Sequence, residues 1–163
     1  MKKALLLSFL AAAALGAAWH FLYDALPCPL TALLAPMNES VWEHLKLLYF
    51  PPLAVGVIMS LRWKQAQRRF WSAMAFILLL MPALLTGIFY ALTAGFGVAA
   101  VPAVDIALYY AVLALGWFLL YRMSSSGWAE PWFGPLVIGA GALGAALVAF
   151  TVAAPPLPIF IGT

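Results

Sequence analysis

The sequence has 163 residues, of which 67% are hydrophobic and only 8% are charged. A soluble domain carries roughly 25% charged residues to cover its surface, so this composition excludes an ordinary soluble fold and predicts a membrane protein. The net charge of +3 does not indicate a nucleic-acid partner, because the basic residues lie in short stretches between apolar runs, where they set membrane orientation.

Five apolar runs predict an all-α polytopic bundle of about five transmembrane helices, over residues 4–23, 38–61, 70–92, 104–122 and 133–152. A run of about 20 residues crosses a ~30 Å hydrocarbon core at 1.5 Å per residue. The first run also has features of a cleaved signal peptide, but it stays apolar beyond the cleavage region, which favours a span. No hydrophilic stretch is long enough for a second domain, so residues 1–163 are predicted to form a single transmembrane domain.

The second span has the most unusual sequence. Prolines from Pro27 to Pro36 predict a loop or interfacial segment before it. Asn38 is the expected N-cap, and Glu39 in the first turn suits the positive end of the helix dipole. We expect the helix to be broken at Pro51-Pro52, because each proline removes a backbone donor and frees a carbonyl one turn earlier.

The cations are distributed unequally between the two ends of the predicted spans. One side holds only Lys46, and the other holds seven cationic residues: Lys2, Lys3, Arg62, Lys64, Arg68, Arg69 and Arg122. By the positive-inside rule, the seven are cytoplasmic. The chain is therefore predicted to lie in a bacterial cytoplasmic (inner) membrane, with its N-terminus in the cytoplasm and its C-terminus outside.

Residues 38–46 carry most of the unusual polar groups, and these lie toward the predicted outer face. A charge near the bilayer centre costs about 2.5 to 3.5 kcal/mol, so such groups should face protein, water or the interface. On a helix, Glu39 and Glu43 would share one face, and Ser40 and His44 would form an adjacent stripe. The predicted ligand-binding set comprises His20, Tyr23, Asn38, Glu39, Ser40, Glu43, His44, Lys46 and Asp105.

Three chemistries remain open for this set. Imidazoles and carboxylates are ligands for divalent metals, with His20, Glu39, Glu43, His44 and Asp105 as candidates. A buried Glu43 near Lys46 or His44 could instead change charge as an ion or proton passes. Glu43 and His44 are also the candidate catalytic pair for acid/base hydrolysis of a lipid or envelope substrate. The alternative without a site is an interfacial helix start, with Glu43 and Lys46 paired in water and Lys46 extending outward.

A glycine-rich stretch in the last span provides a helix-packing face. Residues 139–144 match a dinucleotide fingerprint in spacing, but they lie inside an apolar span with no preceding strand. Small residues four apart within 139–145, such as Ala140 with Gly144 and Gly141 with Ala145, let helices approach closely, within one chain or in a homo-oligomer.

The motifs of the chain resemble those of a family of small bacterial multi-span membrane proteins of unknown function. The resemblance rests on an Asn-Glu-Ser-x-Trp-Glu-His-x-Lys core at 38–46, on His20, Asp105 and Thr151, and on the Pro-Pro-Leu-Pro segment at 155–158. It covers nearly the whole chain and implies a membrane bundle, but no activity. The sequence departs from the family pattern after the Pro-Pro segment, because it ends at Ile161-Gly162-Thr163.

These observations favour an inner-membrane protein with an outward-facing polar pocket that binds or conducts a small polar ligand or ion. The pocket would be lined by His20, Glu39, Glu43, His44 and Asp105. A membrane-embedded hydrolase, with or without a metal, and a non-catalytic accessory subunit are the alternatives.

Overall fold

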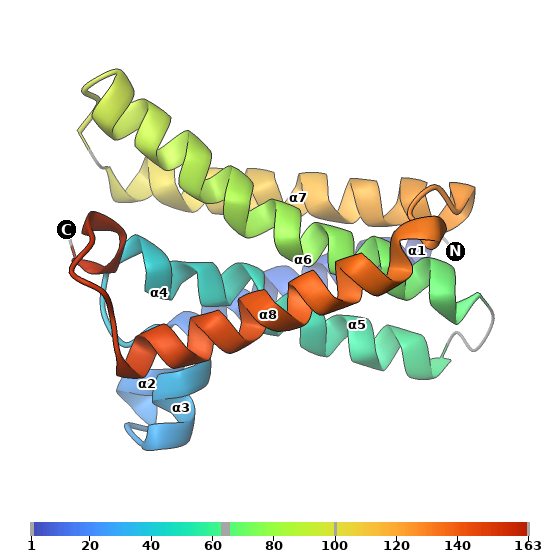
Figure 1. Ribbon diagram of the computed structural model, residues 1–163, viewed down its shortest axis with the longest axis horizontal. Helices are drawn as coiled ribbons and strands as arrows, with labels where there is room; N and C mark the ends of the chain where they lie inside the picture. The colour runs from blue at the N-terminus through green and yellow to red at the C-terminus, as the bar shows by residue number, and fades with distance from the viewer. Residues whose placement is uncertain (1, 63–65, 100, 163) are drawn as a thin grey trace.

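The computed structural model describes residues 2–62, 66–99 and 101–162 (Figure 1). Across these ranges the chain is helices and turns, with one isolated antiparallel bridge between Ser40 and Gly162. The body consists of five long helices: α1 (Lys2–His20), α5 (Phe50–Arg62), α6 (Gln67–Tyr90), α7 (Pro102–Ser126) and α8 (Phe133–Val152).

Shorter elements connect and cap these helices. Three are short α-helices: α2 (Leu22–Ala25), α3 (Pro29–Leu34) and α4 (Val41–Leu45). The others are the 3₁₀ turns η1 (Lys46–Leu48), η3 (Glu130–Trp132) and η4 (Pro158–Phe160), and the π-helix η2 (Ala91–Gly95).

Within the described ranges, four helical stretches are long and apolar enough to cross a membrane: Val41–Arg62, Gln67–Gly95, Pro102–Ser126 and Glu130–Val152. The apolar part of α1, Leu5–His20, is about 24 Å long at 1.5 Å per residue, which is shorter than a ~30 Å hydrocarbon core. The all-helical fold and four membrane-length stretches are therefore established, and a fifth crossing by α1 remains a prediction.

The second span is interrupted earlier than predicted. The α-helical pattern breaks over Lys46–Tyr49, between α4 and α5, and Pro51 and Pro52 lie in the first turn of α5. First-turn N–H groups have no intrahelical partner, so proline is tolerated there, and its ring disfavours helix one turn earlier. The physical reason for the break was correct, but its predicted position was one turn too far along.

Two helix boundaries also differ from prediction. The first helix ends at His20 rather than residue 23, and Tyr23 belongs to α2. The second begins at Val41 with Ser40 as its N-cap, whereas Asn38 was expected there. The last span, Phe133–Val152, matches its predicted range.

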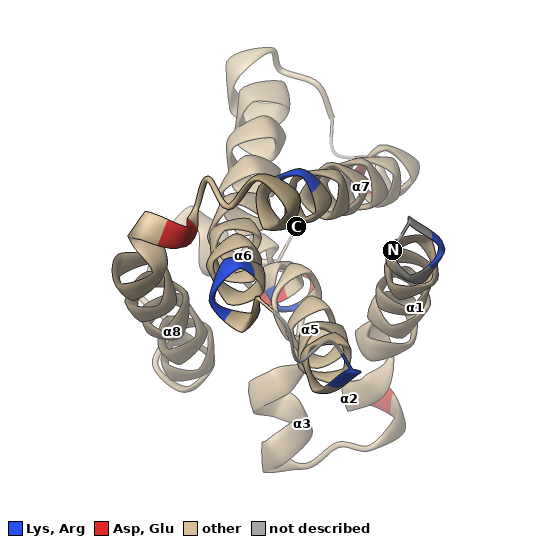
Figure 2. Ribbon diagram, turned by 90° about the vertical axis from the view of Figure 1, so that its right-hand side faces the viewer, with Lys and Arg blue, Asp and Glu red and all other residues tan. Residues whose placement is uncertain are grey.

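The core lies around α6, which α5, α7 and α8 surround (Figure 2). Ile77 and Met81 of α6 and Leu113 of α7 are fully buried. Close approach of α6 and α7 depends on Gly116, because a Cβ there would clash with the Met81 sulfur. Helix α1 is joined to α7 by the Trp117 Nε1–H, which donates to Ser8 Oγ at 3.1 Å.

The small-residue face of α8 divides into two sides. A Cβ on Gly144 would lie 2.6 Å from the hydroxyl of Tyr49, which donates to the Ala140 carbonyl at 2.7 Å. Gly141 is exposed, and a Cβ there would meet nothing within 4 Å. The side of this face with Gly144 therefore packs within the chain, and the side with Gly141 faces outward.

The two ends of the bundle differ in charge, and the chain termini lie at opposite ends (Figure 1). Figure 2 looks onto one of these ends, where basic residues lie on several helices. One end, called here the cationic end, carries the described basic residues Lys3, Arg62, Arg68, Arg69 and Arg122. Lys64 and the side chain of Lys2 lie outside the described residues. The opposite end, with α2, α3, α4 and η4, is called the site end.

Candidate functional site

The turn before α4 determines where the polar side chains of residues 38–46 lie. Asn38 Oδ1 accepts a hydrogen bond from the Ser40 N–H at 2.9 Å, and Ser40 Oγ accepts from the Glu43 N–H at 3.3 Å. This turn delays the helix start to Val41 and leaves Glu39 outside the helix. The prediction that Glu39 and Glu43 share a helix face is therefore wrong, because only Glu43 is on the helix.

Glu43 and Lys46 form an ion pair inside the protein. Lys46 Nζ lies 2.7 Å from Glu43 Oε2, and the side chains are 0% and 3% exposed respectively. Lys46 Nζ also donates to the carbonyl of Ala32 at 2.8 Å and to that of Ala35 at 3.1 Å. All three ammonium protons thus have an acceptor, so the alternative in which Lys46 extends outward into water is wrong.

The Glu43 carboxylate is equally well satisfied. Its Oε2 also accepts from the Met37 N–H at 2.9 Å, and its Oε1 accepts from the Thr151 hydroxyl of α8 at 3.1 Å. The same hydroxyl lies 2.9 Å from the Leu147 carbonyl and shares its single proton between the two acceptors. The buried pair therefore connects α3, α4 and α8 inside the protein, and we call it a structural clamp.

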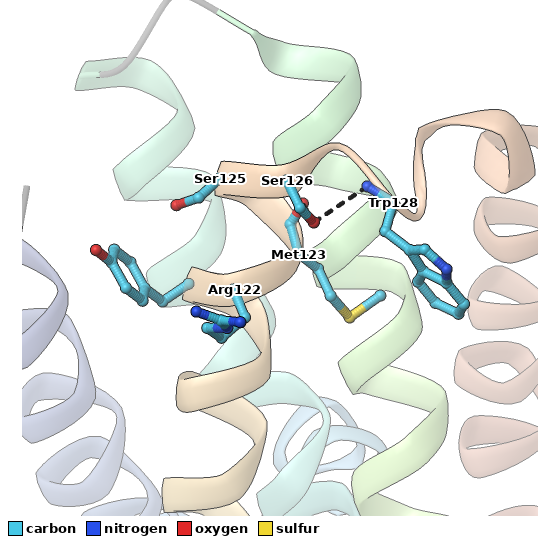
Figure 3. Close-up of a pocket in the computed structure, with 6 residues that line it drawn as sticks. Arg122, Met123, Ser125, Ser126 and Trp128 are labelled. Carbon is cyan, nitrogen blue, oxygen red and sulfur yellow. Dashed lines mark hydrogen bonds between the residues drawn. The ribbon is translucent and has the colours of Figure 1, made fainter.

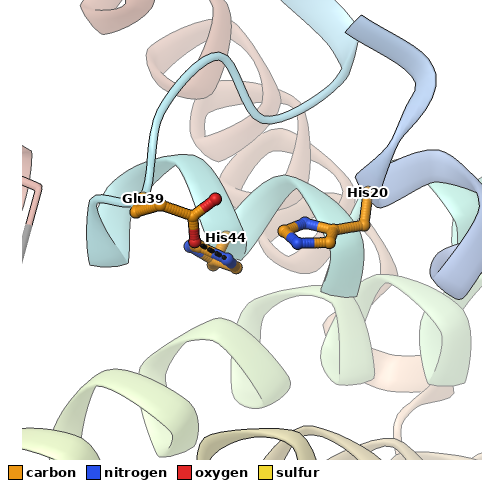
Figure 4. A group of neighbouring side chains, drawn as sticks. All are labelled: His20, Glu39 and His44. Atoms are coloured by element: carbon orange, nitrogen blue, oxygen red, sulfur yellow. Dashed lines mark ion pairs between the residues drawn. The ribbon is translucent and has the colours of Figure 1, made fainter. Parts of the chain in front are cut away.

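A second polar group remains open at the surface. It consists of His20 at the end of α1, Glu39 before α4, and His44 within α4 (Figure 4). One ligand atom from each of the three lies within 4.8 Å of the other two. His44 Nε2 lies 3.4 Å from Glu39 Oε2, and the side chains are 30% and 69% exposed. We call these three residues the open triad.

A hydrogen bond to the backbone determines which nitrogen of the His44 imidazole carries the proton. Its Nδ1 lies 2.9 Å from the Ser40 carbonyl oxygen, which can only accept, so Nδ1 carries the proton. In the neutral ring, the lone pair is then on Nε2, which faces Glu39. A histidine whose second nitrogen donates to a backbone carbonyl is the usual arrangement in metal sites.

His20 completes the triad from another helix. Its ring centre lies 5.2 Å from that of His44, and its Nδ1 is buried and has no hydrogen-bond partner among the described residues. A buried polar atom without a partner costs about 1–3 kcal/mol, so a ligand or ordered water that satisfied it would stabilise the fold. Two imidazoles and one carboxylate have the donor types that zinc and related ions take.

The other predicted residues are not among the three that converge. Glu43 and Lys46 are in the buried pair, and Asn38 and Ser40 shape the turn. Tyr23 on α2 and Asp105 in the first turn of α7 are half-buried, and neither belongs to the metal-type group. The structure thus brings together three of the five candidate metal ligands.

Sequence reasoning missed Thr151 as a partner of Glu43. The available signal was a lone hydroxyl near the end of an otherwise apolar span, next to Phe150. It also missed the ion pair at the cationic end, where Arg69 Nε lies 2.7 Å from Glu130 Oε2.

The cationic end carries a shallow depression of about 530 Å³ (Figure 3). Its lining residues are Tyr121, Arg122, Met123, Ser125, Ser126 and Trp128. None of the predicted site residues lines it. Its wide opening and its single cation give it no defined ligand geometry.

With this geometry established, the chain can be placed among known proteins. It belongs to a family of unknown function, DUF6512, whose model matches residues 1–163. No curated protein and no solved structure matches the chain. The match agrees with the resemblance found in the sequence.

Proposed function

We propose that this chain is an integral membrane protein that binds a divalent transition-metal ion at its extracytoplasmic face, through His20, Glu39 and His44. The observation that carries this proposal is the convergence of three ligand atoms within 4.8 Å, from three separate points of the chain. Ligands around a tetrahedral zinc ion at ~2.1 Å are about 3.4 Å apart, which is the distance between His44 Nε2 and Glu39 Oε2.

The proposed orientation follows from the charge difference between the two ends. The described cations outside the buried pair belong to the cationic end, and α4 lies at the other end. A crossing by α1 would give an odd number of spans, which fits termini at opposite ends. The positive-inside rule then makes the cationic end cytoplasmic and the open triad extracytoplasmic, in a bacterial inner membrane.

The burial of Glu43 and Lys46 favours ion binding over ion conduction. Lys46 and Leu48 are fully buried, and both Glu43 oxygens accept hydrogen bonds. A carboxylate that carries protons or ions needs access to water, and the Glu43 side chain is only 3% exposed. The ion therefore binds and leaves on the same side.

Metal-dependent hydrolysis is the second candidate function. The specific observation in its favour is the ligand number, because three protein ligands leave a fourth position for water, as in catalytic zinc sites. A metal lowers the pKa of bound water and so supplies the nucleophile. Glu43 and Ser40 are committed to structural hydrogen bonds, so Glu39 would be the base available to such a reaction.

The test is metal binding by the purified full-length protein in detergent, with Co²⁺ as a spectroscopic substitute for Zn²⁺. We expect one bound ion and tetrahedral cobalt absorption bands in the wild type. Both should be lost in His44→Ala and strongly reduced in Glu39→Gln and His20→Ala.

Two carboxylate variants serve as matched controls. Asp24→Asn removes an exposed carboxylate on α2, four residues after His20, and Asp105→Asn removes a residue that the sequence alone had placed in the site. Both should bind Co²⁺ like the wild type. Absence of cobalt bands in the wild type would refute the proposal and favour an accessory role, and loss of binding in Asp105→Asn would refute the three-residue site.

A further inference from the structure

The C-terminal segment, residues 155–162, folds back over the site end. After α8 ends at Val152, the chain turns at Pro155 and forms η4 at Pro158–Phe160. Gly162 then pairs with Ser40 in the isolated antiparallel bridge. In Figure 1 this segment rises from the end of α8 to the start of α4. We call it the strap.

An aromatic cluster anchors the strap to α4. The ring of Phe160 lies 4.9 Å from that of Trp42 and 5.6 Å from that of Phe150, measured between centroids. Trp42 and Phe150 are themselves 5.5 Å apart. Aromatic pairs at such distances contribute beyond the area they bury, so Phe160 holds the strap in place.

The end of the strap contacts the backbone that carries two of the proposed ligands. A Cβ on Gly162 would lie 3.8 Å from the Glu39 carbonyl carbon and 3.9 Å from the Ser40 nitrogen. The Ser40 carbonyl orients His44 through its Nδ1–H, and Glu39 precedes Ser40 directly. The strap therefore lies against the peptide units that place Glu39 and aim His44.

We infer that the strap is a positioning element for the open triad, and that strap docking and metal binding stabilise each other. This inference rests on the proposed metal site and adds a means of regulating it. A docked strap holds the Glu39–Ser40 backbone in the conformation that the metal requires. Because linkage is reciprocal, metal binding raises the stability of the docked strap by the same factor.

The first test compares Co²⁺ affinity in the full-length protein. Phe160→Ala removes the aromatic anchor without touching a ligand, and we expect about tenfold weaker binding, within the usual range of coupling between sites. Leu157→Ala is the matched control, because Leu157 is in the strap but 53% exposed, and it should bind like the wild type.

The second test needs no variant for its main result. Hydrogen exchange of residues 155–162 in the wild type should slow when Co²⁺ is added, and His44→Ala should abolish this response. Unchanged exchange with metal bound, or wild-type affinity in Phe160→Ala, would overturn the inference while leaving the metal site intact. A wild type that binds no Co²⁺ overturns the metal site and this inference together.

Discussion

The buried pair and two residues of the open triad, Glu39 and His44, come from the same short stretch of sequence, but the two groups have opposite surroundings. Glu43 and Lys46 are almost completely buried, and each charged atom has protein partners. Glu39 and His44 are partly exposed, and the Nδ1 of His20 has no hydrogen-bond partner in the part of the chain that the structure describes.

This difference separates polar residues that hold the fold together from those proposed to bind an ion. A charged group that is fully paired inside the protein has no bonding capacity left for a ligand, and its removal damages the fold. Exposed groups that converge have unused lone pairs, and their ion pairing contributes little to stability. Substitutions in the two groups should therefore change different measured quantities.

Lys46→Met should have the largest effect on stability. The substitution leaves the Glu43 carboxylate buried without its cation. We expect this to lower the free energy of unfolding by about 3–5 kcal/mol. Denaturant unfolding of the detergent-solubilised protein measures the change. The double variant Glu43→Gln/Lys46→Met removes the unpaired charge and should recover part of the loss. A Lys46→Met protein as stable as wild type would mean that the pair is not buried.

Thr151→Val should have the next largest effect. The substitution preserves shape but takes a hydrogen bond from the buried Glu43 Oε1, which should lower stability by about 1–3 kcal/mol. Thr93→Val is the matched control, because the Thr93 hydroxyl donates to the Phe89 carbonyl one turn earlier without contacting a carboxylate. The same unfolding measurement should give a clearly smaller loss for Thr93→Val, and equal losses would contradict the role of Thr151.

The sequence was sufficient to predict the all-helical class. It also predicted the bounds of a helix where these coincide with the ends of an apolar run. Residues 133–152 form an uninterrupted apolar run, and α8 occupies that range. The proline pair predicted a broken second span for the correct reason. The exact break differed because proline affects the preceding turn and is itself accepted in the first turn of the next helix.

The division of the polar residues could not be predicted from spacing alone. Helical periodicity placed Glu39 beside Glu43, but the hydrogen bond between Asn38 and Ser40 moved the helix start and separated them. The partners of Lys46 are backbone carbonyls of Ala32 and Ala35, and backbone groups leave no trace in a side-chain pattern. Asp105 was included in the predicted site because of its expected depth in the membrane. Depth alone does not determine which residues of other helices a side chain meets, and Asp105 is not among the converging ligands.

Glu39→Gln should leave the stability of the metal-free protein almost unchanged. The exposed contact between Glu39 and His44 should contribute less than about 1 kcal/mol to the free energy of unfolding. The same variant should bind Co²⁺ at least about tenfold more weakly, a loss of about 1.4 kcal/mol in binding free energy. A large stability loss without any change in metal affinity would assign Glu39 to the structural group.

Labelling of Cys28 should perturb the protein least. It tests on which side of the membrane the site end, with the buried pair and the open triad, lies. Cys28 is exposed before α3, and α3 supplies a carbonyl to Lys46. The Thr31 hydroxyl, 3.5 Å from Cys28 Sγ, lowers the pKa of this thiol below its usual value. Since the thiolate is the reactive form, a membrane-impermeant maleimide should label intact cells readily near neutral pH.

The pH dependence of this reaction provides an internal check. Thr31→Val should raise the Cys28 pKa back toward its ordinary value of about 8.5, so labelling should slow near neutral pH and be unaffected well above that value. Labelling that needs permeabilised cells would place the site end in the cytoplasm. The buried pair would remain a structural clamp in that case, but the open triad would then meet cytoplasmic ions, and the proposed extracytoplasmic function would be wrong.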